Sequence, residues 1–341
     1  MTVRNTMLGA VAAVTAVALT ACGGGGQDAP AADGADRIKV VASTNVWGSV
    51  VEAVGGDAVE VTSIIDDPSG DPHSYESKPA DVAAVRDARL VVFNGGGYDD
   101  FFAGLLGPET EGAKKIEAFP ISGKGSGNEE PGHEEPGHEE PGHEEPGHEE
   151  PGHEEPADQG AEDGHGHDHA VNEHVWYDFE TVHKVAEQAA ADLGAIAPDR
   201  KAEFEANAAD LGAKLDELTA RLDGKGAGKE VLQTEPVAHY LLDAAGVGDA
   251  TPESFSDAVE EETDVPAAAL AQVLDLVNGK RVSALVNNVQ TENAATGQVV
   301  DAARSAGVPV VEVTETLPEG ATGYLDWMTK QVDALVGALG A

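Results

Sequence analysis

The chain has 341 residues, of which 63 are acidic and 20 are basic, and its formal net charge is −43. This charge argues against nucleic acid and against an anionic lipid surface as partners, because both would repel the protein, and it is compatible with the attraction of cations. Once an N-terminal leader and a low-complexity insertion are set aside, the remaining length suffices for two compact lobes, each with its own core.

The N-terminus has the pattern of an exported, lipid-anchored protein. Arg4 provides a short basic region, and residues 8–19 form an apolar stretch that is too short to span a bilayer comfortably. The stretch ends in the sequence LTAC, which resembles a bacterial lipobox. The single cysteine, Cys22, excludes an intramolecular disulfide, and we expect it to carry the lipid. We therefore predict a signal peptide over residues 1–21, a flexible tether over residues 22–36, and a protein anchored to the outer face of the cell membrane.

In the first half of the body, short apolar stretches alternate with segments of helical periodicity. We expect strands over residues 38–43, 59–65 and 90–93. We expect helices over residues 47–54, 79–87, 98–106 and 181–193, and then a long helix that ends near residue 222. The apolar residues of this long helix recur at three- and four-residue spacing: Phe204, Ala208, Leu211, Leu215, Leu218 and Leu222.

The second half repeats this alternation. We expect strands over residues 231–234, 282–286 and 308–313, and helices over residues 237–245, 266–277, 294–306 and from 324 onward. Strands that alternate with helices through short turns indicate parallel sheets covered on both faces. The predicted fold is α/β, with two lobes, each a mostly parallel sheet flanked by helices, joined by one long rigid helix. The predicted boundaries are an N-terminal lobe over 37–197 with a disordered insertion at 123–170, a linking helix over 198–224 and a C-terminal lobe over 225–341.

The insertion contains an unusual repeat, which we call the histidine tract. Five consecutive PGHEE units run from Pro131 to Glu155, and GHGHDH follows at residues 164–169. A Pro-Gly pair every five residues prevents a continuous helix or strand, and the repeat has no apolar residue to bury. Its imidazoles beside carboxylates favour weak binding of zinc and similar cations. The histidines in question are His133, His138, His143, His148, His153, His165, His167 and His169.

Further metal-type donors follow the ends of predicted strands or the tract itself. In α/β lobes, ligands bind at the carboxyl ends of the strands, where loops converge. His73 and His174 lie in such loops of the first lobe, and Glu235 and Glu315 lie in such loops of the second. Two imidazoles and two carboxylates, one pair from each lobe, suit a divalent transition metal in a cleft between the lobes.

Four segments make the resemblance to a known family specific. DPHSYESKPADVAAVRDARLVVFNGGGYDDF, EHVWYDF, TEPVAHYLLDAAGV and TETLPEG resemble the substrate-binding proteins of zinc and manganese ABC importers, known as cluster A-I. The similarity extends from about Ile38 to the C-terminus. It implies a metal held between two α/β lobes that a rigid helix links. In many zinc members of the family, a histidine-rich loop precedes the second ligand.

The resemblance implies a ligand set of His73, His174, Glu235 and Glu315. The second motif departs from the usual DPHxW, because Glu173 stands where the proline would be. His239 remains an alternative third ligand, because it lies one helical turn beyond Glu235. Asp71 and Glu173 could orient the neighbouring histidines.

The metal itself is open between two readings. Two carboxylates leave room for Mn²⁺ or Fe²⁺, whereas the histidine tract and the Irving–Williams order favour Zn²⁺. Zn²⁺ is our prediction for the transported ligand, with Mn²⁺ as the alternative. We expect a monomeric binding protein, not an enzyme, that delivers its ion to the membrane permease of an ABC importer. The tract would then be a low-affinity reservoir. A surface zinc buffer or chaperone and an adhesin are the remaining alternatives.

Overall fold

The structure is a computed structural model that describes residues 37–70, 72–125 and 172–340. The predicted signal peptide, the tether with Cys22 and the eight histidines of the tract lie outside these residues, as does Asp71. Within the described ranges, no helix combines the length and the apolar character that a membrane span requires.

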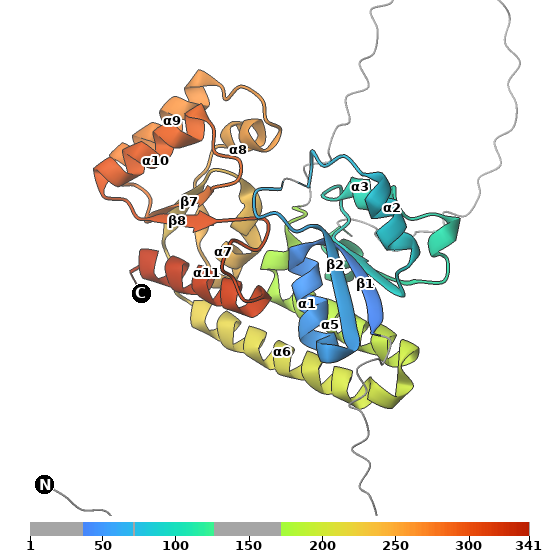
Figure 1. Cartoon of the computed structure of the whole chain (residues 1–341). Coiled ribbons are helices and arrows are strands. Elements are labelled where there is room, and N and C mark those ends of the chain that lie inside the picture. Colours follow the sequence, from blue (N-terminus) through green and yellow to red (C-terminus); the bar gives the residue numbers. More distant parts are fainter. Residues whose placement is uncertain (1–36, 71, 126–171, 341) are drawn as a thin grey trace, which may run out of the picture. The chain divides into compact units, whose positions relative to one another are not determined.

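The first lobe is built on a parallel sheet with the strand order β2-β1-β3-β4 (Figure 1). Its strands are β1 (Ile38–Thr44), β2 (Val59–Ile65), β3 (Leu90–Phe93) and β4 (Lys114–Glu117). Its helices are α1 (Asn45–Gly55), α2 (Pro79–Arg86), α3 (Asp100–Ala103), α4 (Ala118–Ser122) and α5 (Phe179–Ile196).

The second lobe repeats this plan with the order β6-β5-β7-β8, again all parallel. Its strands are β5 (Glu230–Gln233), β6 (Gly248–Asp249), β7 (Ala284–Asn288) and β8 (Val310–Val313). Its helices are α7 (His239–Ala245), α8 (Glu253–Glu260), α9 (Ala267–Asn278), α10 (Ala294–Ala306) and α11 (Tyr324–Ala338). The predicted fold class is therefore confirmed.

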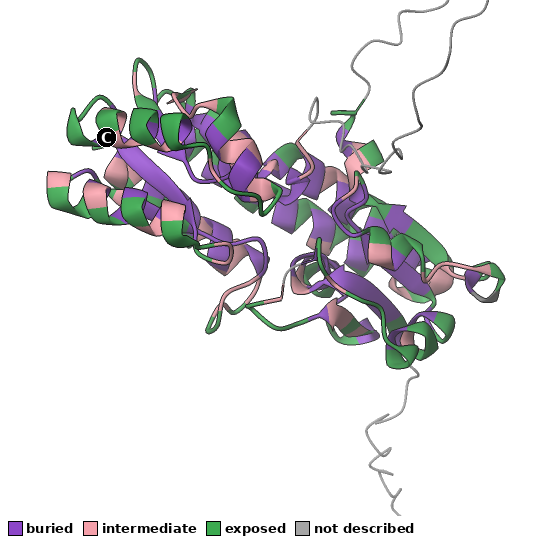
Figure 2. Cartoon of the chain, turned by 90° about the horizontal axis from the view of Figure 1, so that it is seen from above, coloured by how far each residue is buried: buried purple, intermediate pink, exposed green. Residues whose placement is uncertain are grey.

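The strands β1, β3 and β7 in the middle of the sheets are buried almost throughout, so both faces of each sheet are covered there. In β1, Val40 and Ala42 face one hydrophobic cluster, whereas Val41 between them faces another, because side chains alternate along a strand. In β7, Leu285 likewise faces away from its neighbours Ala284 and Val286. Figure 2 shows the buried strands between helices whose outer faces are exposed.

The long helix α6 (Lys201–Leu222) contributes to both lobes. It packs against α1 and α5 of the first lobe and against α7 and α11 of the second, along the lower side of the molecule in Figure 1. Its buried residues are those that the spacing predicted, from Phe204 to Leu222. The inner faces of both sheets and α6 share one hydrophobic cluster, so the two lobes are packed into one compact unit.

Four short elements escaped sequence-based prediction. In β4, only Ile116 is buried, since the strand lies at a sheet edge and its lysines face solvent. The strand β6 has two residues and also lies at an edge. The helices α4 and α8 are five and eight residues long. Elements this short carry too few periods for a pattern to stand out.

Candidate metal site

The predicted donors lie at the carboxyl ends of the parallel strands. The loop after β2 carries His73, and Glu235 lies two residues beyond the end of β5. Glu315 follows β8, and Asn288 is the last residue of β7. Because both sheets are parallel, the carboxyl ends within each sheet meet at one edge. The fold therefore gathers side chains that are far apart in the sequence.

One group of histidine and acidic side chains in the described ranges has the spacing of a metal site. His73, Glu173 and His174 each offer a ligand atom, and these atoms lie within 4.8 Å of one another. His73 is exposed, Glu173 is half-buried and His174 is buried. The ring of Tyr98 contacts both histidines, with ring centroids 5.0 Å from His73 and 6.1 Å from His174. Glu173 was predicted only to orient the neighbouring histidines. In the structure, one of its carboxylate oxygens lies within 4.8 Å of a ring nitrogen of each histidine.

His174 is held in one orientation by Asn172. The amide oxygen Oδ1 of Asn172 accepts from the backbone N–H of His174 at 2.9 Å and lies 3.1 Å from its Nδ1. The amide nitrogen of Asn172 donates to the carbonyl of Pro236 in the second lobe at 2.7 Å. With the amide so oriented, the neutral ring must carry its proton on Nδ1. Nε2 then keeps its lone pair and is the nitrogen that can bind a cation.

Burial lowers the pKa of His174 to about 4, because the charged ring would lose its hydration. The negative charge of Glu173 acts in the opposite direction, and the neighbouring His73 and His239 lower the pKa further. His174 is therefore neutral at pH 7 and available as a ligand without losing a proton.

A glycine-rich turn after β3 holds the backbone of the segment that contains His174. Asn94, at the end of β3, donates from Nδ2 to the carbonyl of Glu173 at 2.9 Å and accepts from the indole of Trp47 at 3.3 Å. The next residue, Gly95, has φ of 73°, a conformation that favours glycine. The buried carboxylate of Asp99 accepts from the backbone N–H of both Asn94 and Gly95 at 2.7 Å. The turn thus fixes the backbone on which the second ligand candidate stands.

The two carboxylates of the second lobe are joined by one amide. Nδ2 of Asn288 donates to Oε2 of Glu235 at 2.5 Å and to Oε1 of Glu315 at 2.8 Å. Thr291 also donates to Oε2 of Glu235, at 2.5 Å. Glu235 and Glu315 are each only 4% exposed. Buried carboxylates need such donors to remain ionised, so Asn288 both orients the pair and supports its charge.

A third acidic side chain of this lobe faces the same region. Burial, then the charges of Glu173 and Glu235, raise the pKa of Glu260 at the end of α8 to about 8. Burial raises the pKa of Tyr177, whose hydroxyl donates to the carbonyl of Thr314 at 2.8 Å, and the charge of Glu315 adds to that rise. These effects place carboxylates of both lobes within electrostatic reach of one another.

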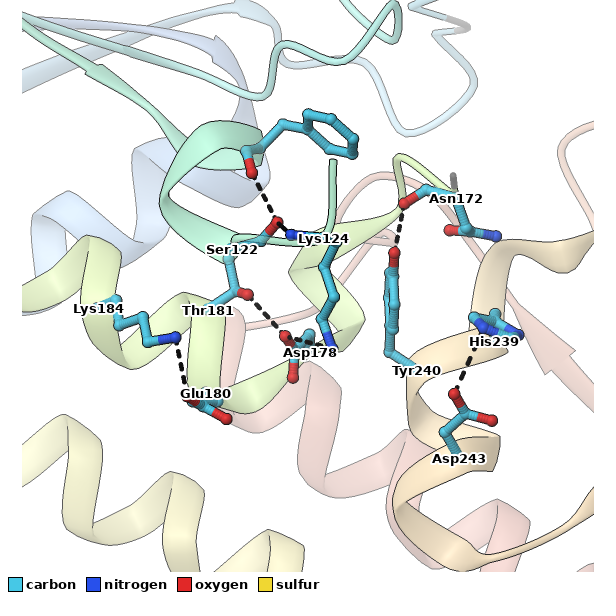
Figure 3. Close-up of polar contacts among 11 residues, drawn as sticks. Ser122, Lys124, Asn172, Asp178, Glu180, Thr181, Lys184, His239, Tyr240 and Asp243 are labelled. Carbon is cyan, nitrogen blue, oxygen red and sulfur yellow. Dashed lines mark hydrogen bonds and ion pairs between the residues drawn. The ribbon is translucent and has the colours of Figure 1, made fainter. Parts of the chain in front are cut away.

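His239 has a different environment from the other candidates. Its side chain is 42% exposed, and its Nε2 lies 3.4 Å from a carboxylate oxygen of Asp243 on the next turn of α7 (Figure 3). It affects the pKa of His174. Among the described residues it is nevertheless not part of the close group that contains His174.

The flanks of the insertion lie beside this region. Lys124, next to the last residue described on the N-terminal side of the histidine tract, places its ammonium 4.7 Å from the centre of the Tyr240 ring and 3.4 Å from the carboxylate of Asp178. On the other flank, the Tyr240 hydroxyl donates to the carbonyl of Asn172 at 2.5 Å. Figure 3 shows Lys124 beside the ring of Tyr240 and Asn172 above its hydroxyl. Lys124 and Asn172, which stand on opposite sides of the tract in the sequence, therefore both contact Tyr240 of α7.

Sequence reasoning missed Asn288 and Glu260 as parts of this region. Asn288 lies two residues beyond the predicted strand over residues 282–286, and a single asparagine after a strand usually indicates only a turn. Glu260 belongs to an unpredicted helix. Neither residue carries a motif, so only their tertiary position identifies them.

Comparison with known proteins assigns the chain to a family. Residues 40–338 match the family described as "ZnuA: Zinc-uptake complex component A periplasmic". The manganese ABC transporter substrate-binding lipoprotein PsaA of Streptococcus anginosus is 27% identical over 285 residues, which cover 77% of this chain and 80% of that one. The manganese-binding lipoprotein MntA of Halalkalibacterium halodurans is 32% identical over 108 residues, which cover 31% of this chain and only 35% of that relative.

A solved structure supports the fold. The periplasmic zinc-binding protein TroA from Treponema pallidum superposes with a TM-score of 0.64 at 15% identity, over 89% of this chain and 99% of that one. At that identity the likeness concerns the fold alone. Since the family match covers nearly the whole chain, the protein belongs to the metal-binding solute-binding proteins of ABC importers, which are transport proteins and not enzymes.

Proposed function

We propose that this protein captures Zn²⁺ where its two lobes meet and delivers the ion to the permease of an ABC importer. The proposed ligands are His73 and His174 from the first lobe and Glu235 and Glu315 from the second. Two observations support the proposal: a close group of His73, Glu173 and His174 in the first lobe, and a buried pair of carboxylates in the second lobe that one amide bridges. The close group of the metal-free protein does not include Glu235 or Glu315, so we propose that the ion itself joins the two sets.

The state of each donor supports cation binding. His174 is neutral and presents Nε2, because Asn172 occupies Nδ1. The two buried carboxylates supply negative charge that a divalent cation would neutralise. Glu173, which lies within ligand distance of both histidines, completes the coordination sphere or orients His73. We prefer Glu235 to His239 as the third ligand, because His239 is paired with Asp243.

Mn²⁺ is the second candidate, and two observations favour it. PsaA and MntA, to which the chain is similar, are both named for manganese. The second lobe contributes carboxylates, which are the harder ligands that manganese accepts. Zn²⁺ remains our choice, because sites of this kind bind zinc more tightly unless geometry forbids it, and because the histidine tract suits zinc.

We further propose that Cys22 carries a lipid and that the histidine tract serves as a low-affinity reservoir. A tethered protein outside the cytoplasm, with weak sites close to the tight one, would raise the local ion concentration at scarce supply. The contacts of Lys124 and Asn172 with Tyr240 support this proposal, because these residues flank the tract and Asn172 also binds His174.

The decisive experiment is a competitive titration with zinc and manganese on the mature protein without residues 129–169. We expect one tight equivalent that prefers zinc and that Glu235→Ala removes, whereas His239→Ala retains it. Retention of manganese against zinc would overturn the choice of metal. If removal of the tract alone abolished the tight equivalent, the protein would be a surface zinc buffer instead.

A further inference from the structure

The loop after β7 contains a glutamine whose side chain reaches both lobes. Oε1 of Gln290 accepts from the backbone N–H of Glu315 and, at 3.4 Å, from that of Thr316. Its Nε2 donates to the carbonyl of Pro68 at 3.0 Å and lies 3.4 Å from that of Gly70. The same Nε2 donates to the hydroxyl of Thr316 at 3.0 Å. One amide therefore satisfies backbone groups of two separate loops.

Both loops carry proposed ligands. Gly70 is three residues before His73, in the loop that follows β2 of the first lobe. Glu315 stands in the loop that follows β8 of the second lobe, and its own N–H is one of the groups that Gln290 holds. The hydroxyl of Thr316 adds a direct link to the carbonyl of Pro68 at 3.3 Å. The amide thus lies between a ligand candidate of each lobe.

Apolar packing does little to hold the first part of the loop after β2, whereas further along this loop Pro72 is buried and the ring of His73 contacts Tyr98. Residues 66–69 are exposed. A groove of about 530 Å³ separates the start of this loop from the segment around Leu317, and its lining includes polar side chains such as Glu52 and Ser63. A segment that buries no apolar side chain keeps its position mainly through hydrogen bonds.

We propose that Gln290 is a positioning residue that ties the His73 loop to the Glu315 loop and thereby sets the separation of the metal ligands contributed by the two lobes. The contacts themselves are independent of any metal, whereas their consequence for metal release rests on the proposed function. Gln290 need not touch the ion, because it acts through the backbone of both loops.

The chemistry explains why an amide is required here. The planar amide of glutamine carries a donor, Nε2, and an acceptor, Oε1. In Gln290, Nε2 faces carbonyl oxygens and Oε1 faces backbone N–H groups. In Gln290→Glu the acceptor half is kept, while the donor half becomes an oxygen that faces the Pro68 carbonyl. In Gln290→Met both halves are lost at similar volume. Gln298→Glu is the matched control, because that exposed residue on α10 adds the same charge and bonds only the carbonyl of Ala294 in its own helix.

The test combines two measurements on the full-length protein. In metal-free protein, we expect faster amide hydrogen exchange over residues 66–76 in both Gln290 variants, with α5 and α6 unchanged. In zinc-loaded protein, we expect release to a chelator to accelerate roughly fivefold, since a hydrogen bond contributes about 1 kcal/mol. The added carboxylate of Gln290→Glu would by itself slow the release of a cation, so acceleration in that variant isolates the lost donor.

The outcomes separate this inference from the proposed function. Wild-type exchange over residues 66–76 in both variants would overturn the link between the loops. Faster exchange with unchanged metal release would overturn its role in ligand positioning. If the wild-type protein held no tight metal, the proposed function would fail, and the exchange measurement would still decide whether Gln290 holds the loop.

Discussion

The neutral state of His174 makes the stability of the metal-free protein depend on pH. Burial lowers the pKa of His174 from 6.5 to about 4 in the folded protein, whereas the unfolded chain keeps the ordinary value. Between these values the unfolded state binds more protons, so stability is lost as the pH falls. A difference of 2.5 pKa units corresponds to about 3.4 kcal/mol in the limit of low pH. At pH 4.5, roughly 2.5 kcal/mol of this is lost.

A pair of variants isolates this contribution. His174→Gln cannot titrate, so the difference in the free energy of unfolding between wild type and variant should shrink by roughly 2.5 kcal/mol from pH 7.5 to pH 4.5. His183→Gln removes a half-exposed histidine of α5 and serves as the control. Denaturant unfolding of metal-free protein at several pH values measures both differences.

Parallel stability curves for wild type and His174→Gln would refute the reasoning, because they would mean that the folded and unfolded states hold the same protons on this ring. If the difference in unfolding free energy from wild type changed equally between pH 7.5 and pH 4.5 for His174→Gln and His183→Gln, any histidine substitution would have the same effect. The same pKa implies that protonation of His174 does not compete with a bound cation until the pH is close to 4. A histidine ligand with the ordinary pKa of about 6.5 would make metal affinity fall as the pH drops through that value. For His174 this fall is expected only near pH 4.

Three further predictions concern groups around the site. Asn288→Ala should weaken tight metal binding by roughly 10- to 100-fold in competition titrations, because residues that orient ligands have effects of this size, whereas Asn278→Ala on an exposed helix end should not. The pKa of Glu260 is raised to about 8, so the folded state holds the extra proton and stability falls as the pH rises from 4.5 to 8; Glu260→Gln should raise the melting temperature at pH 8.5 and leave it nearly unchanged at pH 4.5, and an equal gain at both pH values would contradict this. Tyr240→Phe removes the hydrogen bond to the carbonyl of Asn172 and should cost about 1 kcal/mol of unfolding free energy, measurable by denaturant titration; no loss would show that water replaces the hydroxyl.

Much of the architecture was accessible from local patterns. The strand over residues 90–93 and the helix over residues 294–306 were predicted with the bounds that the structure has. These segments have strong signals, since a continuous apolar run suits a strand buried on both faces, and Asn293 caps the helix with hydrogen bonds to Ala295 and Thr296. The edge strand β4 was missed, because Lys114 and Lys115 obscure its single buried residue.

The candidate ligands could be named from the sequence because a motif and its spacing carried them. His73, His174, Glu235 and Glu315 were chosen in this way, and their assignment as ligands stays a prediction. A sequence motif does not show which residue lies beside it on a neighbouring strand of the sheet. Asn288 is separated from Glu235 by 53 residues, yet its amide nitrogen lies 2.5 Å from that carboxylate.

The sequence by itself determined the α/β lobes, the long helix between them, and the residue types available to hold a cation. These follow from hydrophobic periodicity and from short motifs, which act over a few residues. Only the tertiary structure decided that Glu173 joins the two histidines, that one asparagine bridges two buried carboxylates, and that Gln290 connects the loops of both lobes. Such contacts depend on how parallel strands from distant parts of the chain align their carboxyl ends, and no local pattern records that alignment.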